Sequence, residues 1–417
     1  MSILKKSQKS LISIYSLRVV LELFTSTFLV SYIVTLNPEN IFGTGLLNVA
    51  IFYISWFFVY IISNFVISFF VDKSNRLSLL RLGIFVSLTL LIAIVIWGKQ
   101  LSEWIILAGA LCGVSDGFFY PSYYVVKNEL SENKTNREYN LVATVLENLV
   151  KIIVPTILGY IIDVSSFSRI AIYITFVALV QFGLTFLLKS TRPNDSKFEL
   201  MKYFKFLKED KFARNKIKYT YLNAFFAGFK TAYRVIIIVL TIYAFKTNLS
   251  LGFYTSIFST ITIILLIFSK RIDNNKNINK FPLYLILGLL PLIGAIVLVL
   301  FTNKYVLIAY SLTSTIALNF SGYLGSVERD AIIKNLDKYD FIAEHQFVHE
   351  ALQCISRIIA YLLFIVASLF TSINAFKVLI VVLLLMNPIK FVIMYKQRQI
   401  RLEFENNKEK QIEQKSL

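Results

Sequence analysis

Twelve long apolar stretches, six on each side of a basic middle segment, constrain this chain more than any other feature of its sequence. A helix needs about 20 mostly apolar residues to cross the hydrocarbon core of a bilayer. We therefore expect membrane-spanning helices at residues 11–35, 44–70, 77–97, 103–127, 140–163, 169–189, 219–244, 249–269, 281–302, 304–327, 342–369 and 374–395. The sequence predicts an all-α polytopic membrane protein whose main partner is the lipid bilayer.

The composition agrees with this prediction. Of the 417 residues, 56% are hydrophobic and 16% are charged, whereas soluble proteins carry about 25% charged residues. The mean hydropathy is +0.66. Cys112 and Cys354 both fall inside apolar stretches, so neither a disulfide framework nor a metal cluster is expected.

The distribution of basic residues indicates how the chain is oriented. The formal net charge of +18 suggests nucleic acid binding, but the excess lies in alternate loops. Residues 189–218 hold ten Lys or Arg against four acids, whereas residues 36–43 hold no basic residue. Short cytoplasmic loops of membrane proteins are enriched in Lys and Arg. We therefore expect no nucleic acid partner and both termini in the cytoplasm, in the plasma membrane of a bacterium.

Four parts follow from the span positions: an N-terminal six-helix bundle at 1–189, a basic cytoplasmic linker at 190–218, a C-terminal six-helix bundle at 219–395, and a cytoplasmic tail at 396–417. Apolar residues recur at roughly helical spacing among the lysines of 198–212, which favours an interfacial helix on the cytoplasmic leaflet. A solvated linker is the alternative. The polar tail is expected to be a frayed helix.

The two halves resemble each other. The segment LENLVKIIVPTIL around Lys151 matches LQCISRIIAYLLF around Arg357, and VVKNEL at 125–130 matches IIKNL at 332–336. Small residues also recur four apart in the fourth and tenth spans, at Gly109, Gly113 and Gly117 and at Ala317, Ser321 and Gly325. Such stripes let helix backbones approach closely in lipid. Two pseudo-symmetric six-helix halves are a common plan of transporters.

The turn after the second span reads Ser68-x-x-x-Asp72-Lys73-Ser74-Asn75-Arg76. It resembles the signature loop of the major facilitator superfamily, G-x-x-x-D-R-x-G-R followed by Arg or Lys. A weaker copy, Ser269-x-x-x-Asp273 then Lys276, follows the eighth span. In the fifth span, Pro155 and Gly159 resemble a degenerate form of the antiporter motif of that superfamily, G-P-x-x-G-G. The 12-span bacterial proton-coupled exporters are the members that the chain resembles.

This resemblance implies alternating access, in which two bundles rock about a central site. It also implies that Asp72, Lys73 and Arg76 gate the cytoplasmic side. The alternative is that Lys73 and Arg76 only fix the topology. In the superfamily, helices 1, 4, 7 and 10 line the cavity, with helices 5 and 11 beside them.

Ionisable residues deep in the predicted spans fall only in spans 1, 4, 5, 7 and 11. They are Arg18, Glu22, Asp116, Glu147, Lys151, Lys230, Arg234, His345, His349, Glu350 and Arg357. Arg81 and Lys390 lie near the cytoplasmic ends of their spans, where long side chains reach the interface. Each charge at the centre of a span costs about 2.5–3.5 kcal/mol on insertion scales, so these residues predict a polar, functional cavity.

The spacing of these charges suggests a site for an anionic group. Arg18 and Glu22 lie four residues apart on one helix face, as do Glu147 and Lys151. Lys230 and Arg234 are also four apart but repel each other unless an anion or an acid lies between them. We expect a carboxylate or phosphate of the substrate to bind a basic set consisting of Arg18, Lys151, Lys230, Arg234 and Arg357. The alternative is a fixed lattice of ion pairs that joins the bundles.

Proton coupling needs a group whose pKa changes between the inward and outward states. Glu22 is the first candidate and Asp116 the second, with Glu147 and Glu350 as further candidates. The alternative is that these carboxylates stay permanently paired. His345 and His349 share a face, but no third strong ligand is visible, so no metal and no cofactor are expected.

The sequence therefore predicts a monomeric secondary transporter that exports an amphipathic anionic or zwitterionic small molecule in exchange for protons. A flippase for a lipid-linked headgroup, which is a lipid-like substrate, or uptake of an anionic nutrient would use the same fold and site. The loops hold no set of catalytic residues and no nucleotide-binding motif, so neither an enzyme nor an ATP-driven pump is expected.

Overall fold

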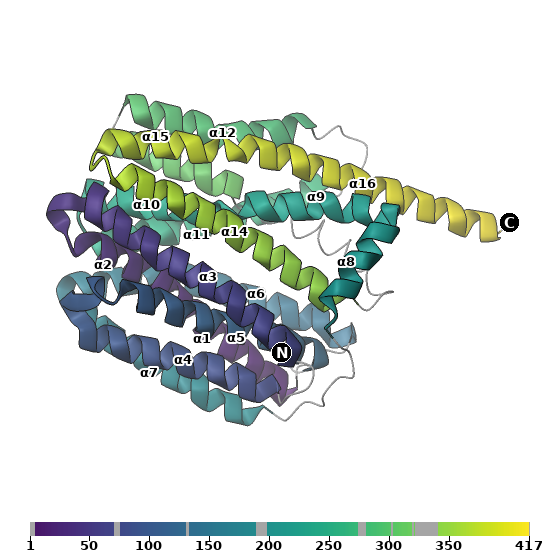
Figure 1. The fold of residues 1–417 in the computed structure, drawn as a ribbon, viewed down its shortest axis with the longest axis horizontal. Coiled ribbons are helices and arrows are strands. Elements are labelled where there is room, and N and C mark those ends of the chain that lie inside the picture. Colours follow the sequence, from purple (N-terminus) through teal and green to yellow (C-terminus); the bar gives the residue numbers. More distant parts are fainter. Residues whose placement is uncertain are drawn as a thin grey trace. The chain divides into compact units, whose positions relative to one another are not determined.

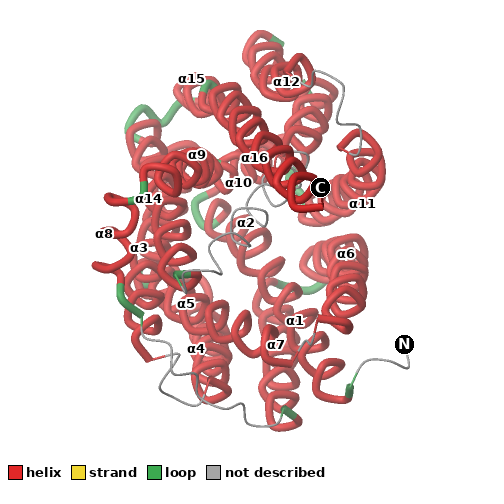
Figure 2. The backbone as a smooth tube through the Cα atoms, turned by 90° about the vertical axis from the view of Figure 1, so that its right-hand side faces the viewer, coloured by secondary structure: helices red, strands yellow, loops and turns green. Residues whose placement is uncertain are grey.

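The computed structural model describes residues 5–70, 76–130, 133–188, 198–273, 281–301, 303–318, 321 and 341–416. Within these residues every regular element is a helix, as Figure 2 shows. This confirms the predicted all-α class.

The helices of the first half follow the predicted spans closely (Figure 1). The first span consists of two α-helices separated by a π-helical turn. The elements are α1 (Lys6–Leu23), the π-turn (Phe24–Phe28), α2 (Leu29–Thr35), α3 (Leu46–Phe70), α4 (Arg76–Trp97), α5 (Ile105–Leu130), α6 (Asn133–Val164) and α7 (Phe167–Leu184).

The second half begins with a short helix in the predicted linker and ends with a long helix that includes the tail. The elements are α8 (Leu200–Glu209), α9 (Lys211–Gly228), α10 (Lys230–Phe245), α11 (Asn248–Asp273), α12 (Phe281–Leu300), a helix at Lys304–Leu318, α14 (Ile342–Ser368), α15 (Ile373–Leu384) and α16 (Met386–Ser416).

Ten helical segments of the described residues are long and apolar enough to cross a membrane. They coincide with ten of the predicted spans, which confirms a polytopic membrane protein. The predicted eighth span lies in α11, whose side chains beyond residue 264 are outside the described residues. The predicted tenth span begins with the helix at Lys304–Leu318 and continues into residues that the structure does not describe.

The glycine stripe of α5 packs against α3. The close approach of two helix backbones was predicted from the spacing, but the partner helix was not. A Cβ atom at Gly109 or Gly113 would lie less than 3.0 Å from the carbonyl oxygen of Phe52 or Trp56. At Gly117 a Cβ atom would lie 2.5 Å from the Cβ atom of Ser63. Because neighbouring backbone cannot move aside, only glycine lets α3 and α5 pack this closely.

By its internal contacts the chain divides into two compact units. The first comprises Met1–Lys197, Arg234–Ile261 and Arg357–Leu379, and the second comprises Phe198–Tyr233, Thr262–Ser356 and Ile380–Leu417. The first unit therefore contains the predicted N-terminal bundle together with segments of α10, α11, α14 and α15. The predicted boundaries at residues 189 and 219 remain predictions.

In the second unit, the predicted linker helix is present as α8. Tyr203 is fully buried, whereas Met201 and Phe204 are 81% and 46% exposed. The helix α16 continues without a break from the last span through the predicted tail (Figure 1).

The prediction that Lys390 reaches the membrane interface is wrong. Lys390 is only 5% exposed, and its Nζ donates a hydrogen bond to Ser321 Oγ at 2.9 Å. Arg81 of α4 contacts the residue that follows α7, because its Nε donates a hydrogen bond to Thr185 Oγ1 at 3.3 Å. The hydroxyl group of Ser321 therefore gives Lys390 a hydrogen-bond partner inside the second unit. The position of Lys390 near the end of its predicted span did not indicate this partner.

We predict that Gly113→Ala lowers the melting temperature of the purified protein, because the added methyl group clashes with α3 backbone. Overpacking of this kind costs about 1–3 kcal/mol. Gly183→Ala in α7 is the matched control, because no atom lies within 4 Å of the position that the added Cβ atom would take and Ala is the better helix former by up to about 1 kcal/mol. Equal melting temperatures for the two variants would contradict the packing of α3 on α5.

Candidate functional site

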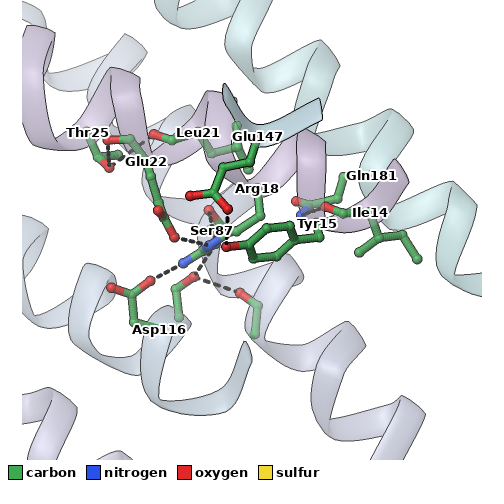
Figure 3. A network of polar contacts seen from close by, with 12 residues as sticks. Ile14, Tyr15, Arg18, Leu21, Glu22, Thr25, Ser87, Asp116, Glu147 and Gln181 are labelled. Atoms are coloured by element: carbon green, nitrogen blue, oxygen red, sulfur yellow. Dashed lines mark hydrogen bonds and ion pairs between the residues drawn. The ribbon is translucent and has the colours of Figure 1, made fainter. Parts of the chain in front are cut away.

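A buried ion pair between Arg18 of α1 and Asp116 of α5 is the centre of the site (Figure 3). The Arg18 side chain is 5% exposed, and its Nη2 contacts Asp116 Oδ1. The other oxygen of Asp116 accepts a hydrogen bond from Trp56 Nε1 at 3.0 Å. Arg18 Nη1 donates to Ser115 Oγ at 3.1 Å and to Ser87 Oγ at 3.4 Å. Side chains of α1, α3, α4 and α5 therefore converge on one buried arginine.

Aromatic rings complete the surroundings of this guanidinium group. Its central carbon lies 4.8 Å from the ring centre of Phe119 and 6.0 Å from that of Tyr120. Aromatic faces attract a cation through their negative quadrupole. The Arg18 charge is thus compensated by a carboxylate, two hydroxyl groups and two rings.

Glu22 lies beside this pair but is held much more weakly. Its Oε1 is 3.9 Å from Arg18 Nε, and neither atom has a hydrogen-bond partner among the described residues. The Glu22 side chain is 36% exposed, against 12% for Asp116. Asp116 is therefore held by Arg18 and Trp56, whereas the Glu22 carboxylate has one long contact with Arg18.

A second ion pair, between Glu147 and Lys151 of α6, lies near the first. Tyr15 of α1 donates a hydrogen bond to Glu147 Oε2 at 3.2 Å, while Lys151 Nζ contacts Glu147 Oε1. Figure 3 shows Glu147 and Tyr15 next to Arg18. This arrangement joins α6 to α1.

The two pairs and Glu22 form what we call the charge cluster. The charge cluster consists of Arg18, Glu22, Asp116, Glu147 and Lys151, and its other four members all act electrostatically on Glu22. When every group is ionised, two cations face three carboxylates, and charges interact strongly where water is scarce. The surplus carboxylate suits the uptake of a proton or of a cationic group.

Arg234 and Arg357 gather around the aromatic side chains of α3. The guanidinium of Arg357 lies 4.8 Å from the ring centre of Phe57, and both arginines act electrostatically on Tyr53. Tyr361, one turn after Arg357, stacks on Tyr53 with ring centres 4.5 Å apart. Two of the predicted basic residues are thus brought together in the first unit. The predicted Lys230 belongs to the second unit.

Two helix irregularities adjoin the predicted site residues. The π-turn Phe24–Phe28 directly follows Glu22 and Leu23, and the helix of the seventh span is interrupted at Phe229, directly before Lys230. Such π-turns and broken helices are frequent at functional sites of membrane transporters. Neither irregularity was predicted from the sequence. The sequence features at these two places are the hydroxyl side chains of residues 25–27 at the π-turn and Gly228 at the interruption.

The two histidines of α14 lie in a polar cluster of the second unit. His345 Nδ1 lies 3.2 Å from the Tyr203 hydroxyl and 3.1 Å from that of Tyr221, which links α14 to α8 and α9. Burial raises the pKa of Tyr203 to about 12 although its hydrogen bond with Tyr221 lowers it, so its hydroxyl stays protonated at neutral pH. His349 Nδ1 is 3.7 Å from Glu350 Oε1. Neither tyrosine was predicted.

Two of the predicted gating residues, Asp72 and Lys73, lie outside the described residues. Arg76 begins α4 and is 3% exposed. Within the described part of the chain, no three His, Cys, Asp or Glu side chains lie close enough together to hold a metal ion.

A polytopic helical protein with buried charges beside broken helices has the architecture of a membrane transporter. The family model of the Major Facilitator Superfamily matches residues 19–331, and the chain belongs to that superfamily. The chain is thus a member of a superfamily of transporters rather than of enzymes.

Two further comparisons found similar proteins. The fold is similar to a crystal structure of a POT family transporter in complex with 5-aminolevulinic acid, with a TM-score of 0.68 and 13% sequence identity, over 94% of this chain and 96% of that one. At this identity the likeness shows the fold alone. The chain is also 25% identical, over 240 residues, to "Uncharacterized protein YqgE" of Bacillus subtilis (strain 168). This match covers 56% of the chain and 54% of that protein, so it spans about half the length of the curated relative.

We predict that Asp116→Asn strongly lowers the stability of the protein, because it leaves the Arg18 charge buried without its carboxylate partner. Removing one partner of a buried ion pair costs about 3–5 kcal/mol. The double variant Arg18→Gln with Asp116→Asn should be more stable than Asp116→Asn alone, as measured by thermal unfolding in detergent. If the effects of the two substitutions simply add, the two side chains do not stabilise each other.

Proposed function

We propose that this chain is a proton-coupled secondary transporter with twelve spans and both termini in the cytoplasm, in the plasma membrane of a bacterium. Membership of the superfamily supports alternating access. The basic residues of alternate loops support the orientation. A monomer is the expected functional form, because each predicted site is built within one chain.

The proposed substrate is an amphipathic anionic or zwitterionic small molecule. Arg234 and Arg357 supply positive charge beside the rings of Tyr53, Phe57 and Tyr361. No hydrogen bond or ion pair of Arg234 is found within the described residues, and its side chain is exposed. An arginine in this position can bind a carboxylate or phosphate through two parallel hydrogen bonds, while the rings contact the apolar part of the substrate.

Glu22 carries the proposed coupling to protons. The observation that supports it most is the contrast with Asp116, which is held by Arg18 and Trp56, whereas Glu22 Oε1 has no hydrogen-bond donor within the described residues. Protonation of Glu22 would leave two cations facing two carboxylates in the charge cluster. The balance of charge in the cluster would therefore change with each transport cycle.

Export is the proposed direction of transport, because Pro155 and Gly159 resemble the antiporter motif. Flipping of a lipid-linked headgroup is the second candidate function, which the aromatic side chains beside Arg357 also suit. Uptake of an anionic nutrient would use the same residues in the opposite direction.

We predict that Glu22→Gln abolishes proton-driven accumulation in liposomes of a compound that the wild-type protein transports. Exchange of that compound across the membrane without a proton gradient should continue, because glutamine keeps the shape of the protonated side chain. Glu39→Gln, in an exposed turn, is the matched control and should accumulate the compound normally. Normal accumulation by Glu22→Gln would show that another group couples transport to protons.

We predict that Arg234→Gln raises the KM for an anionic or zwitterionic compound by roughly tenfold or more, because a hydrogen bond to a charged group contributes about 1.5–3 kcal/mol. Arg234→Lys should restore part of the affinity, since the charge remains but the two-pronged geometry is lost. Arg169→Gln removes another exposed arginine and serves as control. An unchanged KM for Arg234→Gln would exclude this residue from the substrate site.

A further inference from the structure

The helices α6 and α11 cross in direct backbone contact within the first unit. A Cβ atom at Gly159 would lie less than 3.0 Å from the carbonyl oxygen of Asn248, and one at Gly252 less than 3.0 Å from that of Pro155. The hydroxyl groups of Thr156 and Ser256 are 2.8 Å apart. Pro155 and Gly159, the residues of the degenerate antiporter motif, therefore lie at this crossing.

Asp163, near the end of α6, fastens the two helices together. Its Oδ1 accepts hydrogen bonds from the backbone N–H and the side-chain amide of Asn248, each at 3.0 Å, and its Oδ2 accepts one from Leu249 N–H at 2.8 Å. The first N–H groups of a helix lack acceptors within the helix, and negative charge is favoured there. The carboxylate thus caps the N-terminus of α11.

A third helix joins at the same point. Ser31 of α2 donates a hydrogen bond to Asn248 Oδ1 at 2.9 Å. Asn248 is therefore held from α2 on one side and from α6 on the other. We call the set of Asp163, Asn248 and Ser31 the latch.

The latch adjoins two loops that the distribution of basic residues places outside the cell. Residues 165–166 connect α6 to α7, and residues 246–247 connect α10 to α11. Asp163 itself is exposed to solvent. Along α6, Asp163 lies 12 residues beyond Lys151 of the charge cluster, which is about 18 Å of helix.

We propose that the latch holds the charge cluster closed toward the outside, and that Asp163 is its positioning residue. To open the outer side, α6 has to separate from α11, and this separation breaks all three hydrogen bonds of the Asp163 carboxylate. This inference rests on the proposed topology for the direction of opening. It does not depend on the substrate or on proton coupling.

The test uses Ser256→Cys as a reporter in a protein whose native cysteines are replaced, Cys112→Ala and Cys354→Ala. Ser256 is 8% exposed at the crossing. A membrane-impermeant maleimide is added to the outside of intact cells that produce the full chain. We expect Asp163→Asn to speed labelling of the reporter by roughly tenfold or more, since a charge-assisted hydrogen bond is worth about a factor of ten or more. Glu103→Gln, which changes an exposed carboxylate in the turn before α5, next to another predicted outer loop, should leave the rate unchanged.

An unchanged labelling rate in Asp163→Asn would overturn the proposal. The proposal would also be overturned if Asp163→Asn sped labelling only in inverted vesicles, in which the reagent reaches the cytoplasmic side, and not in intact cells. If the Asp163→Asn protein is not found in the membrane, Asn248→Ala is measured in its place. This variant keeps both backbone donors to Asp163 but loses the side-chain hydrogen bonds to Ser31 and to Asp163. We expect a several-fold faster rate for Asn248→Ala, and an unchanged rate would overturn the latch. Because the reporter needs no transport, failure of the proposed function would appear separately in the liposome assays.

Discussion

The ion pair of Arg18 and Asp116 is the interaction on which the rest of the first unit depends. A membrane interior penalises a single buried charge heavily, so the arginine requires its carboxylate, its two serine hydroxyls and its aromatic neighbours together. These partners come from α4 and α5, while Trp56 adds α3 through Asp116. One buried charge on α1 therefore fixes how four helices meet, and the glycine stripe of α5 lets α3 come close enough to take part.

The pairing of Arg18 with Asp116 also determines which contacts are left for Glu22. Because Asp116 occupies Arg18, the Glu22 carboxylate keeps an oxygen with no hydrogen-bond partner among the described residues, next to the π-turn of the first span. Glu147 is shared between Tyr15 and Lys151. Farther along α6, the latch fastens the same helix to α11. A single helix thus connects the charge cluster with the contact that we propose must break when the outer side opens.

Much of this architecture follows from the sequence, because apolar length and small-residue spacing are local properties. Ten of the predicted spans, the pairs Arg18–Glu22 and Glu147–Lys151, and the close packing at Gly109 and Gly113 are confirmed. The sequence did not indicate that Arg18 would pair most tightly with Asp116, since the two are 98 residues apart. Nor did it indicate that Tyr203 would contact His345 or that Ser321 would bury Lys390. Each of these depends on which helices become neighbours, and one chain's periodicity carries no such information.

The most direct test of proton-coupled transport through the basic site is substrate-dependent proton flux in liposomes that contain the wild-type protein and a pH-sensitive dye. A panel of anionic, zwitterionic and cationic amphiphiles is added in turn. We expect proton flux with anionic or zwitterionic compounds, because Arg234 and Arg357 are the proposed binding charges and Glu22 is the proposed proton site. Flux with cationic compounds alone would contradict this mechanism, since the basic site would then not be the site of transport.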